Sequence, residues 1–504
     1  MNLKRRLIPG LLALAMLLLS GCSGSDAPPQ VNATAAPSAT ATATPEPTPT
    51  ATSIPADMLF DITVFPPTCQ ANGYSVYVSR ETGGINIRDE VPRLPHDYGE
   101  WSIDMETGAL SRVCAMCGEE DYHSADGLPR ILLFGDAEAL TESGSATLEA
   151  RFIRPWRDNA FTGWARIDWP GYSEENRIKR DLSVAFYDDE TLAQPHDFEL
   201  FKGVARNAYP LAANTIDLTQ CRHLTCAQLW NRLSGTGDAP ESMPVTVYLN
   251  GDFKGLYSMQ LPLEAALYGM EADGPQAAIT PANPYSFVSP FLDSADFDAE
   301  WRVLFCGSED DQWLRDSLRE LVDFVHDSDD ETFHEQLRAY LDTDSAIDYM
   351  LFMYAMGLSQ STSKDIALLK DGYDPWTLAP FDMSDAFNLD YDGNAMPVEV
   401  FLPTRDADGR WDSGTRSPLW DRLLNVFAPE IRLRWRELRE TVLVGDDIAR
   451  QVRFNLWFVP ERVMRSDRAQ YHRSFYLTNP ARQMQQFIGP RLMLLDDLFG
   501  TDGT

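Results

Sequence analysis

The sequence predicts an α+β fold with a β-rich N-terminal part and a helical C-terminal part. Segments of alternating apolar and polar residues, typical of half-buried strands, recur in the first part at 146–153, 163–169 and 182–187. Apolar residues at helical spacing prevail later, first in 308–341. After both lies the stretch 351–391, whose pattern reads as the end of a helix, a polar loop, a hairpin and an acidic pair.

The N-terminus predicts an exported, membrane-anchored protein. Residues 1–22 have a basic start, an apolar run at 11–19 and the ending Leu-Ser-Gly-Cys, which resembles a bacterial lipobox. Cys22 would then be the lipidated first residue of a lipoprotein on the extracytoplasmic face of the cell membrane. The alternative is an uncleaved signal anchor, although the apolar run is shorter than the ~20 residues that span a bilayer.

Residues 23–55 consist mostly of Ala, Thr, Pro and Ser, a composition that predicts a disordered linker. The remaining chain divides into a β-rich N-terminal segment, 56–145, and a large domain, 146–504, which is long enough to bury a sizeable core. The net charge is 42 basic minus 76 acidic residues, or −34. This charge argues against nucleic acid as a partner, because binding phosphates requires positive charge.

Cysteines beyond Cys22 permit up to three disulfides, and the pairing stays open. They are Cys69, Cys114, Cys117, Cys221, Cys226 and Cys306. The pair Cys114-x-x-Cys117 is alternatively a redox or metal-binding pair. Cys221 and Cys226 lie five residues apart on a predicted helix, a poor geometry for bonding each other, so buried thiols are an alternative there.

Two stretches carry chemistry. Asp365 and Asp382 offer hard oxygen ligands of the kind that Mg²⁺ and Mn²⁺ prefer, and Asp385 stands close by. Earlier in the chain, a glycine turn at Gly171 precedes Lys179, an arrangement in which backbone amides and an ammonium group can hold a phosphate. The structural alternative for the second stretch is a hairpin with a surface lysine.

The central stretch resembles the core of the CotH kinase family (spore coat protein H type). That family reads approximately G-N-x-D-x-x-x-x-N, a gap, then W-x-x-x-P-x-D-x-D-x-x-F. The matching positions are Gly357, Asp365 in place of the metal-binding Asn, Trp376, Pro380, Asp382 and Phe387. One position departs, because the catalytic Asp of the family falls on Gln360.

Two further stretches resemble the same family, so that the likeness covers about 146–498. The glycine-turn stretch matches through Gly171, Ser173, Lys179 and Phe186, and a later element matches through Asp217, Thr219 and Arg222. The hairpin 245–259, with a turn at Asn250-Gly251, also resembles the family pattern. Where the family continues to a Glu that could pair with the lysine, this chain has Leu261.

The resemblance implies an atypical protein-kinase-like fold that uses ATP with Mg²⁺ or Mn²⁺ to phosphorylate surface or coat proteins on Ser or Thr. Gly171, Ser173 and Lys179 would hold the nucleotide phosphates. Asp365 and Asp382 would ligate the metal, and Lys179 is expected to approach Asp382 across one cleft. Arg222 would order the site by pairing with a carboxylate. Trp376 would lie near the nucleotide base or in the core.

Whether the chain is an enzyme stays open at this point. Gln360 cannot accept a proton, and loss of a general base typically costs ~10²- to 10⁴-fold in rate. ATP is also scarce outside the cytoplasm. The alternative to an active kinase is therefore a catalytically degenerate, pseudokinase-like binding or structural protein of the cell envelope, and a third option is an enzyme that uses another phosphorylated donor.

Overall fold

The computed structural model describes residues 59–99, 102–103, 110–123, 127–136, 144–156, 160–168, 179–201, 204–233, 238–270, 274–282, 297, 299–362, 364–415, 417–471 and 479–500. Cys22 and the linker 23–55 lie outside the described residues. The chain forms two compact units, Met1–Arg93 and Leu94–Thr504. The second unit thus begins earlier than the boundary at residue 146 that the sequence predicts.

The first unit contains a three-stranded antiparallel sheet. Its strands are β1 (Phe60–Phe65), β2 (Gly73–Ser79) and β3 (Ile85–Val91), and β2 lies in the middle. Gly73 opens β2 where the chain passes very close to itself, because a Cβ at this position would lie 2.5 Å from Pro67. A side chain there would clash, which explains the glycine at this point.

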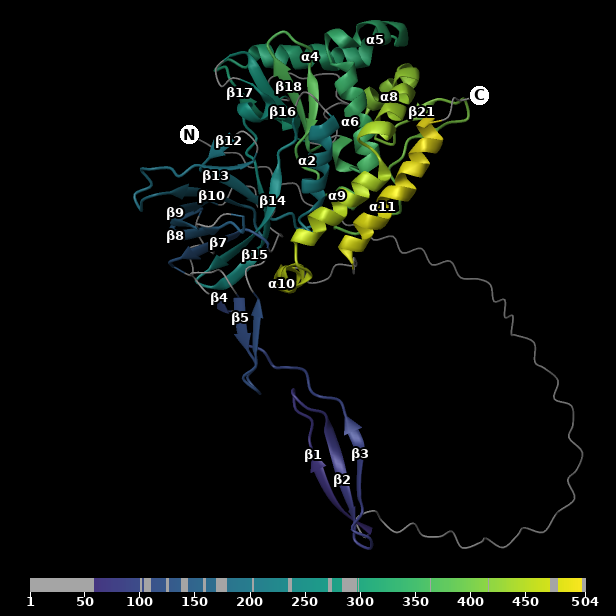
Figure 1. The fold of residues 1–504 in the computed structure, drawn as a ribbon. Coiled ribbons are helices and arrows are strands. Elements are labelled where there is room, and N and C mark those ends of the chain that lie inside the picture. The colour runs from purple at the N-terminus through teal and green to yellow at the C-terminus, as the bar shows by residue number, and fades with distance from the viewer. Residues whose placement is uncertain are drawn as a thin grey trace, which may run out of the picture. The chain divides into compact units, whose positions relative to one another are not determined.

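The second unit begins with a small antiparallel sheet and continues into a closed barrel (Figure 1). The small sheet contains β4 (Ser102–Ile103), β5 (Leu110–Val113) and β6 (Glu120–His123). The barrel order is β10-β13-β15-β14-β7-β8-β9, and β9 pairs with β10 to close it. Its strands are β7 (Arg130–Phe134), β8 (Ser145–Ile153), β9 (Phe161–Asp168), β10 (Leu182–Tyr187), β13 (Ala208–Ala212), β14 (Ser242–Leu249) and β15 (Asp252–Gln260).

The strand patterns explain the barrel interior. In β10, Leu182, Val184 and Phe186 are buried while the residues between them are partly exposed, as expected for a strand with one face inside. The hairpin between β14 and β15 turns at Asn250 and Gly251, which both have positive φ (51° and 91°). The predicted hairpin is confirmed. A short ribbon of β11 (Phe198–Phe201) and β12 (Val204–Arg206) follows β10.

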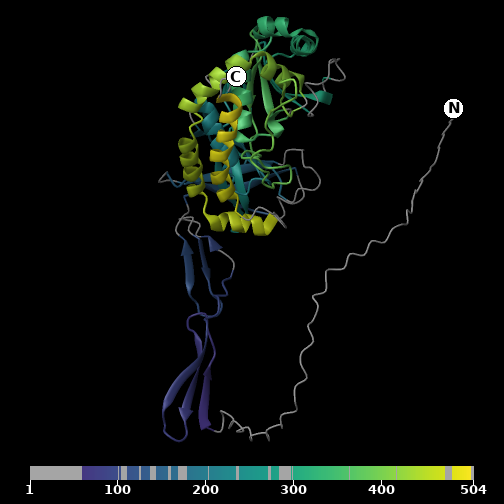
Figure 2. The same cartoon turned by 90° about the vertical axis from the view of Figure 1, so that its right-hand side faces the viewer.

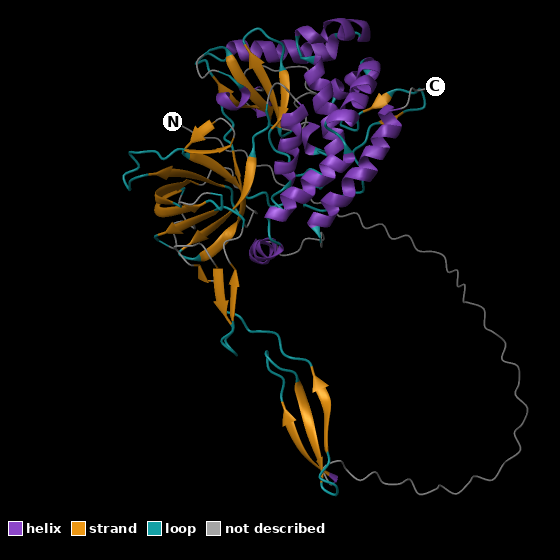
Figure 3. Ribbon diagram, viewed as in Figure 1, coloured by secondary structure: helices purple, strands orange, loops and turns teal. Residues whose placement is uncertain are grey.

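The rest of the second unit is a four-stranded sheet with helices around it, so the mixed α+β class, β-rich first and helical later, is confirmed (Figure 3). The sheet order is β17 (Trp301–Cys306), β16 (Gln276–Pro281), β18 (Ile366–Asp371) and β19 (Thr377–Pro380). The helices are α2 (Arg222–Leu233), α4 (Gln312–Asp327), α5 (Asp330–Gln336), α6 (Thr343–Met356), α7 (Pro418–Val426), α8 (Ala428–Thr441), α9 (Gly445–Phe458), α10 (Glu461–Tyr471) and α11 (Pro480–Leu495).

Short elements complete the second unit. They are η1 (Ala265–Tyr268), η2 (Leu337–Ala339), η3 (Gln360–Thr362), the π turn η4 (Asp496–Gly500), and the strands β20 (Thr404–Arg405) and β21 (Trp411–Asp412). The late helices α9 and α11 lie side by side in both views (Figures 1 and 2). Among the helices that the structure describes, none has the length and apolar character needed to cross a membrane.

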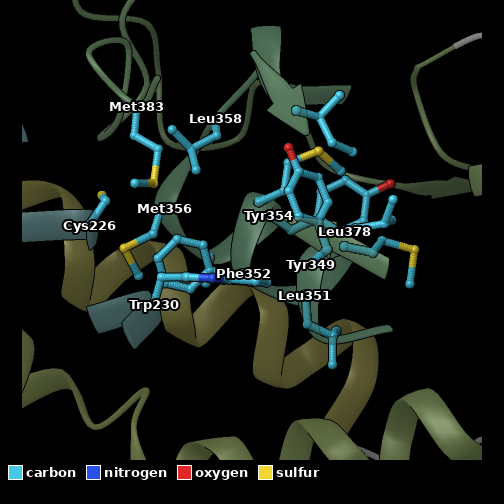
Figure 4. Close-up of a cluster of buried hydrophobic side chains, with 14 of the residues drawn as sticks. Cys226, Trp230, Tyr349, Leu351, Phe352, Tyr354, Met356, Leu358, Leu378 and Met383 are labelled. Carbon is cyan, nitrogen blue, oxygen red and sulfur yellow. The ribbon is translucent and has the colours of Figure 1, made fainter. Parts of the chain in front are cut away.

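Helix α6 is the central element of the core. Every residue from Ala346 to Met356 is shielded from solvent, whereas Asp344 and Ser345 near the start of the helix are not, as expected for a helix that is apolar on nearly all sides. Trp230 of α2 packs edge-on against Phe352 with ring centroids 5.3 Å apart (Figure 4). The helix ends at Gly357 in the left-handed conformation (φ 65°), where a Cβ would lie 2.8 Å from Phe487. This tight end directs the chain into the next loop.

Candidate functional site

A pocket of about 490 Å³ opens between the barrel and the segment that follows α6. The barrel side contributes residues near the start of β10 and the end of β13, and the other side contributes the loop after α6 and the acidic hairpin. The polar residues that line the pocket are Asp181, Ser183, Asn214, Thr215, Gln260, Arg302, Gln360, Lys364, Asp365, Asp382, Ser384, Asp385 and Tyr391. The structure therefore brings Gln360, Asp365 and Asp382 together, as the sequence predicts, although they come from three local elements.

Gln360 begins the short helix η3, which follows the end of α6 after three intervening residues. Its backbone N–H donates a hydrogen bond to Asp385 Oδ2 at 3.1 Å, which joins the loop to the acidic hairpin. The loop is also fixed from α6, because the Tyr349 hydroxyl donates to the Ser361 carbonyl oxygen at 2.7 Å. Position 360 is thus well defined, and the side chain at that position is a neutral amide.

Asp365 stands just before β18 in a left-handed conformation (φ 61°), which Asp and Asn adopt more readily than most residues. Its carbonyl oxygen accepts the Phe381 N–H at 3.2 Å, so Asp365 and Asp382 lie at the same end of the paired strands β18 and β19. Burial raises the pKa of Asp365 well above its usual range, and the nearby charge of Asp382 adds to this, while Lys364 opposes it.

Asp382 is held in place by the residues around it. Its Oδ1 accepts the Ser384 N–H at 2.9 Å, which fixes the turn that follows. The N–H of Met383, the residue after Asp382, donates to His223 Nδ1 at 3.3 Å. On the other side of the ring, His223 Nε2 lies 2.9 Å from the Pro240 carbonyl oxygen. Burial lowers the pKa of His223, which keeps the ring neutral, so one nitrogen accepts and the other donates. His223 is therefore a positioning residue for the Asp382 turn.

Asp385 is the most buried of the three carboxylates, with 3 % of its surface exposed. Burial raises the pKa of Asp385 to about 7; the Gln360 N–H opposes the rise and the Asp382 charge adds to it. A carboxyl group with this pKa is about half protonated near neutral pH. The raised pKa values of Asp365 and Asp385 show that the pocket disfavours full ionisation of its carboxyl groups.

Arg222 is fully buried and is not among the described residues that line the pocket. Its guanidinium donates to the Ala386 carbonyl oxygen at 2.6 Å and to Gln483 Oε1 at 2.8 Å, and its Nε lies 3.4 Å from Asp217 Oδ1. Asp217 in turn accepts the Arg222 backbone N–H at 2.9 Å. Arg222 therefore holds the segment that follows Asp385, which is an ordering role.

Lys179 has another partner than Asp382. Its Nζ lies 2.9 Å and 3.1 Å from the two carboxylate oxygens of Asp467 on α10, and it also donates to the Leu256 carbonyl oxygen. The lysine is 1 % exposed and is not among the described lining residues of the pocket. Burial lowers the pKa of Lys179, while Asp467 opposes this and keeps the charged form favourable. The cations that line the pocket are Lys364 and Arg302.

Trp376 is a core residue in the structure. It is 1 % exposed, and its indole Nε1 donates to Ser317 Oγ at 3.1 Å. It is not among the described residues that line the pocket. Gly171 and Ser173, the other candidates for binding nucleotide phosphates, lie outside the described residues.

The donor set fits a magnesium or manganese ion. Both ions prefer carboxylate oxygens, and Mg²⁺ is usually held by one or two carboxylates together with water and substrate phosphates, so a complete protein cage is unnecessary. Asp365 and Asp382 would hold the ion, with Asp385 beside them. The raised pKa of Asp365 reflects burial and like charge, both of which a bound cation would offset. When bound, the ion would neutralise charge on phosphate oxygens.

Two features of this region escaped the sequence reasoning. Asp467 lies 288 residues from Lys179, and no local pattern marks it as the partner of that lysine. Arg302 on β17 reaches the pocket from a strand that carries no motif. Lys364, by contrast, stands next to Asp365 in the central stretch, so its position in the sequence could have indicated that it lines the pocket.

Comparison with known protein families agrees with these observations. A family model described as CotH kinase protein matches residues 170–495. No curated protein matches the chain. The matched region contains the pocket, α6, the acidic hairpin and the Lys179–Asp467 pair. Because the match spans more than half of the 504 residues, the chain belongs to the CotH kinase protein family.

Proposed function

We propose that the pocket binds ATP together with Mg²⁺ or Mn²⁺, and that the chain transfers phosphate to Ser or Thr of a surface or coat protein at a rate limited by Gln360. The observation that supports this most is the meeting of Asp365, Asp382 and Asp385 with Gln360 in one pocket of about 490 Å³. Phosphoryl transfer depends mainly on positioning and on neutralising charge, so an acidic, metal-capable pocket is its first requirement.

The charges in the pocket support binding of a metal–nucleotide complex. The three carboxylates can take the cation, while Lys364 and Arg302 line the same pocket and offer positive charge to phosphate oxygens. In this scheme Lys179 acts at a distance from the phosphates. Its pairing with Asp467 joins β15 to α10, since Asp467 also accepts the Leu256 N–H at 2.8 Å.

The second candidate is a non-catalytic binding or structural protein of the cell envelope. Two observations favour it: the amide at position 360 cannot act as a base, and the lysine of the family pattern is enclosed by Asp467 and Tyr257. Both candidates share nucleotide and metal binding, and they differ in whether phosphate is transferred.

Replacing Asp382 with Ala should weaken Mg²⁺-dependent ATP binding by at least about tenfold, the lower end of what loss of an outer-shell partner of a metal ligand costs. Calorimetric titration of the whole chain with ATP at fixed Mg²⁺ measures this. The control is Asp374→Ala, which removes the same charge from the exposed turn between β18 and β19. Equal affinity of the Asp382→Ala chain and the wild type would remove Asp382 from the metal site, and a wild type that binds no nucleotide would exclude both candidates.

We also infer that the protein is a lipoprotein anchored at the extracytoplasmic face of the cell membrane, because a lipobox-like ending precedes Cys22 and a Pro- and Thr-rich linker follows it. Cys22→Ala should move the protein from the membrane fraction to the soluble fraction, as seen by fractionation in high salt. The control is Cys306→Ala, which leaves the N-terminus unchanged. Retention of the Cys22→Ala protein on membranes would contradict the lipid anchor.

A further inference from the structure

Outside the pocket, the second unit holds a compact group of soft metal ligands. His96, Cys114 and Cys117 each offer one ligand atom, and these atoms lie within 4.8 Å of one another. The closest contact joins His96 Nδ1 and Cys117 Sγ at 3.4 Å. One imidazole nitrogen and two sulfurs at this separation match the donor set of a zinc site.

The fold builds this group through a tight turn at the start of the second unit. Cys114 directly follows β5, and its N–H donates to the Glu119 carbonyl oxygen at 2.9 Å just before β6. Gly118 closes the turn in a left-handed conformation (φ 71°), and its N–H donates to the Cys114 carbonyl oxygen at 2.8 Å. The turn brings Cys117 back beside Cys114.

His96 reaches the turn from a neighbouring segment. Tyr98 pairs with Cys114 in an antiparallel bridge, and the Ala115 N–H donates to the Asp97 carbonyl oxygen at 2.7 Å. His96 also stacks on Tyr98, with ring centroids 5.1 Å apart. The backbone and the stacking together fix the histidine beside the two sulfurs.

The orientation of His96 is the one that a metal ligand needs. Its Nε2 lies 3.6 Å from Glu119 Oε2, on the side of the ring away from the sulfurs. A carboxylate at one ring nitrogen favours the proton there and leaves the other nitrogen, Nδ1, as the metal donor. This carboxylate–histidine arrangement is a regular feature of zinc sites.

Cys114 supplies its sulfur from a position that the backbone of the turn fixes. The thiolate is the form of cysteine that binds metal. Cys114 is 1 % exposed and Cys117 is half-buried, so the site is sheltered and still reachable.

The surrounding sheet gives a reason for a bound metal. Among the residues that the structure describes in β4, β5, β6 and the turns between them, none belongs to the hydrophobic clusters of the unit. A small sheet without its own apolar core needs another source of stability, and structural zinc supplies it in many small domains.

We propose that His96, Cys114 and Cys117 bind one structural Zn²⁺ ion, which fixes the turn after β5 to the segment around His96. Thiolate and imidazole ligands favour zinc over the hard cations of the pocket, so the two sites are chemically separate. The proposal does not depend on nucleotide binding. The competing use of the two sulfurs is a Cys114–Cys117 disulfide, for which His96 would be irrelevant.

The test is metal analysis of the whole chain, purified with reductant and dialysed against excess Zn²⁺. We expect about one tightly held equivalent of zinc in the wild type, and its loss in Cys114→Ser, Cys117→Ser and His96→Ala. His96→Cys should retain the ion, because a third thiolate can replace imidazole. Cys306→Ser is the matched control, since the Cys306 thiol donates to the Ser308 carbonyl oxygen and lies outside the group, so its zinc content should equal that of the wild type.

Cobalt substitution provides a readout that a merely structural role of these residues would not change. The Co²⁺-loaded wild type should show thiolate-to-metal charge-transfer absorption, and His96→Cys should increase it. Two thiolates would leave the fourth position to water, and three would assign it to a further cysteine; either result supports the three ligands proposed. Failure of the reduced wild type to hold zinc, or unchanged zinc content in both Cys114→Ser and Cys117→Ser, would overturn the site, whatever the ATP titration shows.

Discussion

Replacing Gln360 with Asp should raise phosphoryl transfer by about 10²- to 10⁴-fold, the usual contribution of a general base. The carboxylate would accept the proton of the acceptor hydroxyl, at a position that the Asp385 contact and the end of α6 already define. The measurement is transfer of labelled phosphate from ATP, at saturating Mg²⁺, to a Ser- and Thr-containing acceptor protein. Hydrolysis of ATP, in which water accepts the phosphate, serves as a readout that needs no acceptor protein.

Gln360→Asn is the matched control, because Asn has the shape of Asp and cannot accept a proton. It should transfer phosphate no faster than the wild type. If nucleotide binds and Gln360→Asp brings no gain with either acceptor, more than one residue separates this site from an active one. The non-catalytic function would then be the better description.

Replacing Lys179 with Met should lower the free energy of unfolding by about 3–5 kcal/mol, the usual cost of removing one partner of a buried ion pair. Lys179 and Asp467 have side chains that are 0 % and 4 % exposed, so the remaining buried carboxylate would lose its ammonium partner. Urea unfolding of the whole chain, followed by tryptophan fluorescence, measures the loss in the transition of the second unit.

Two variants separate the ion pair from the simple removal of a lysine. The double variant Lys179→Met/Asp467→Leu should be more stable than Lys179→Met alone, because the buried carboxylate is removed together with its ammonium partner. Arg465→Met, on the same helix, breaks an exposed pair with Glu461 and should cost at most about 1 kcal/mol. A loss for Lys179→Met no greater than that of Arg465→Met would show that Lys179 has no structural importance.

The sequence predicts local structure well wherever one face of an element is buried. The strand predicted at 182–187 is β10, and the hairpin with Asn250-Gly251 forms as expected. The barrel as a whole has no such signal, because it also depends on the parallel pairing of β14 with β7, two strands more than a hundred residues apart. The boundary predicted at residue 146 separates β7 from the barrel for the same reason.

The candidate site follows the same rule. Gln360, Asp365 and Asp382 lie within one local unit of helix, loop and hairpin, and their spacing predicts a shared pocket. Lys179 lies just before strand β10 of the barrel, far from this unit in the sequence. Its carboxylate partner is Asp467 because of how α10 packs, and no sequence motif predicts that packing. His96 shows the same limit, since the Cys114-x-x-Cys117 pair is visible in the sequence and its third ligand is not.

The pairing of Lys179 with Asp467 also sets an order of events during synthesis. A ribosome adds about 5–20 residues per second, so the 288 residues between the two partners take roughly 15 to 60 s to make. During that interval the first part of the barrel exists without the helix that neutralises its buried ammonium group. The domain therefore cannot reach its final packing as it emerges, and completion has to wait for α10.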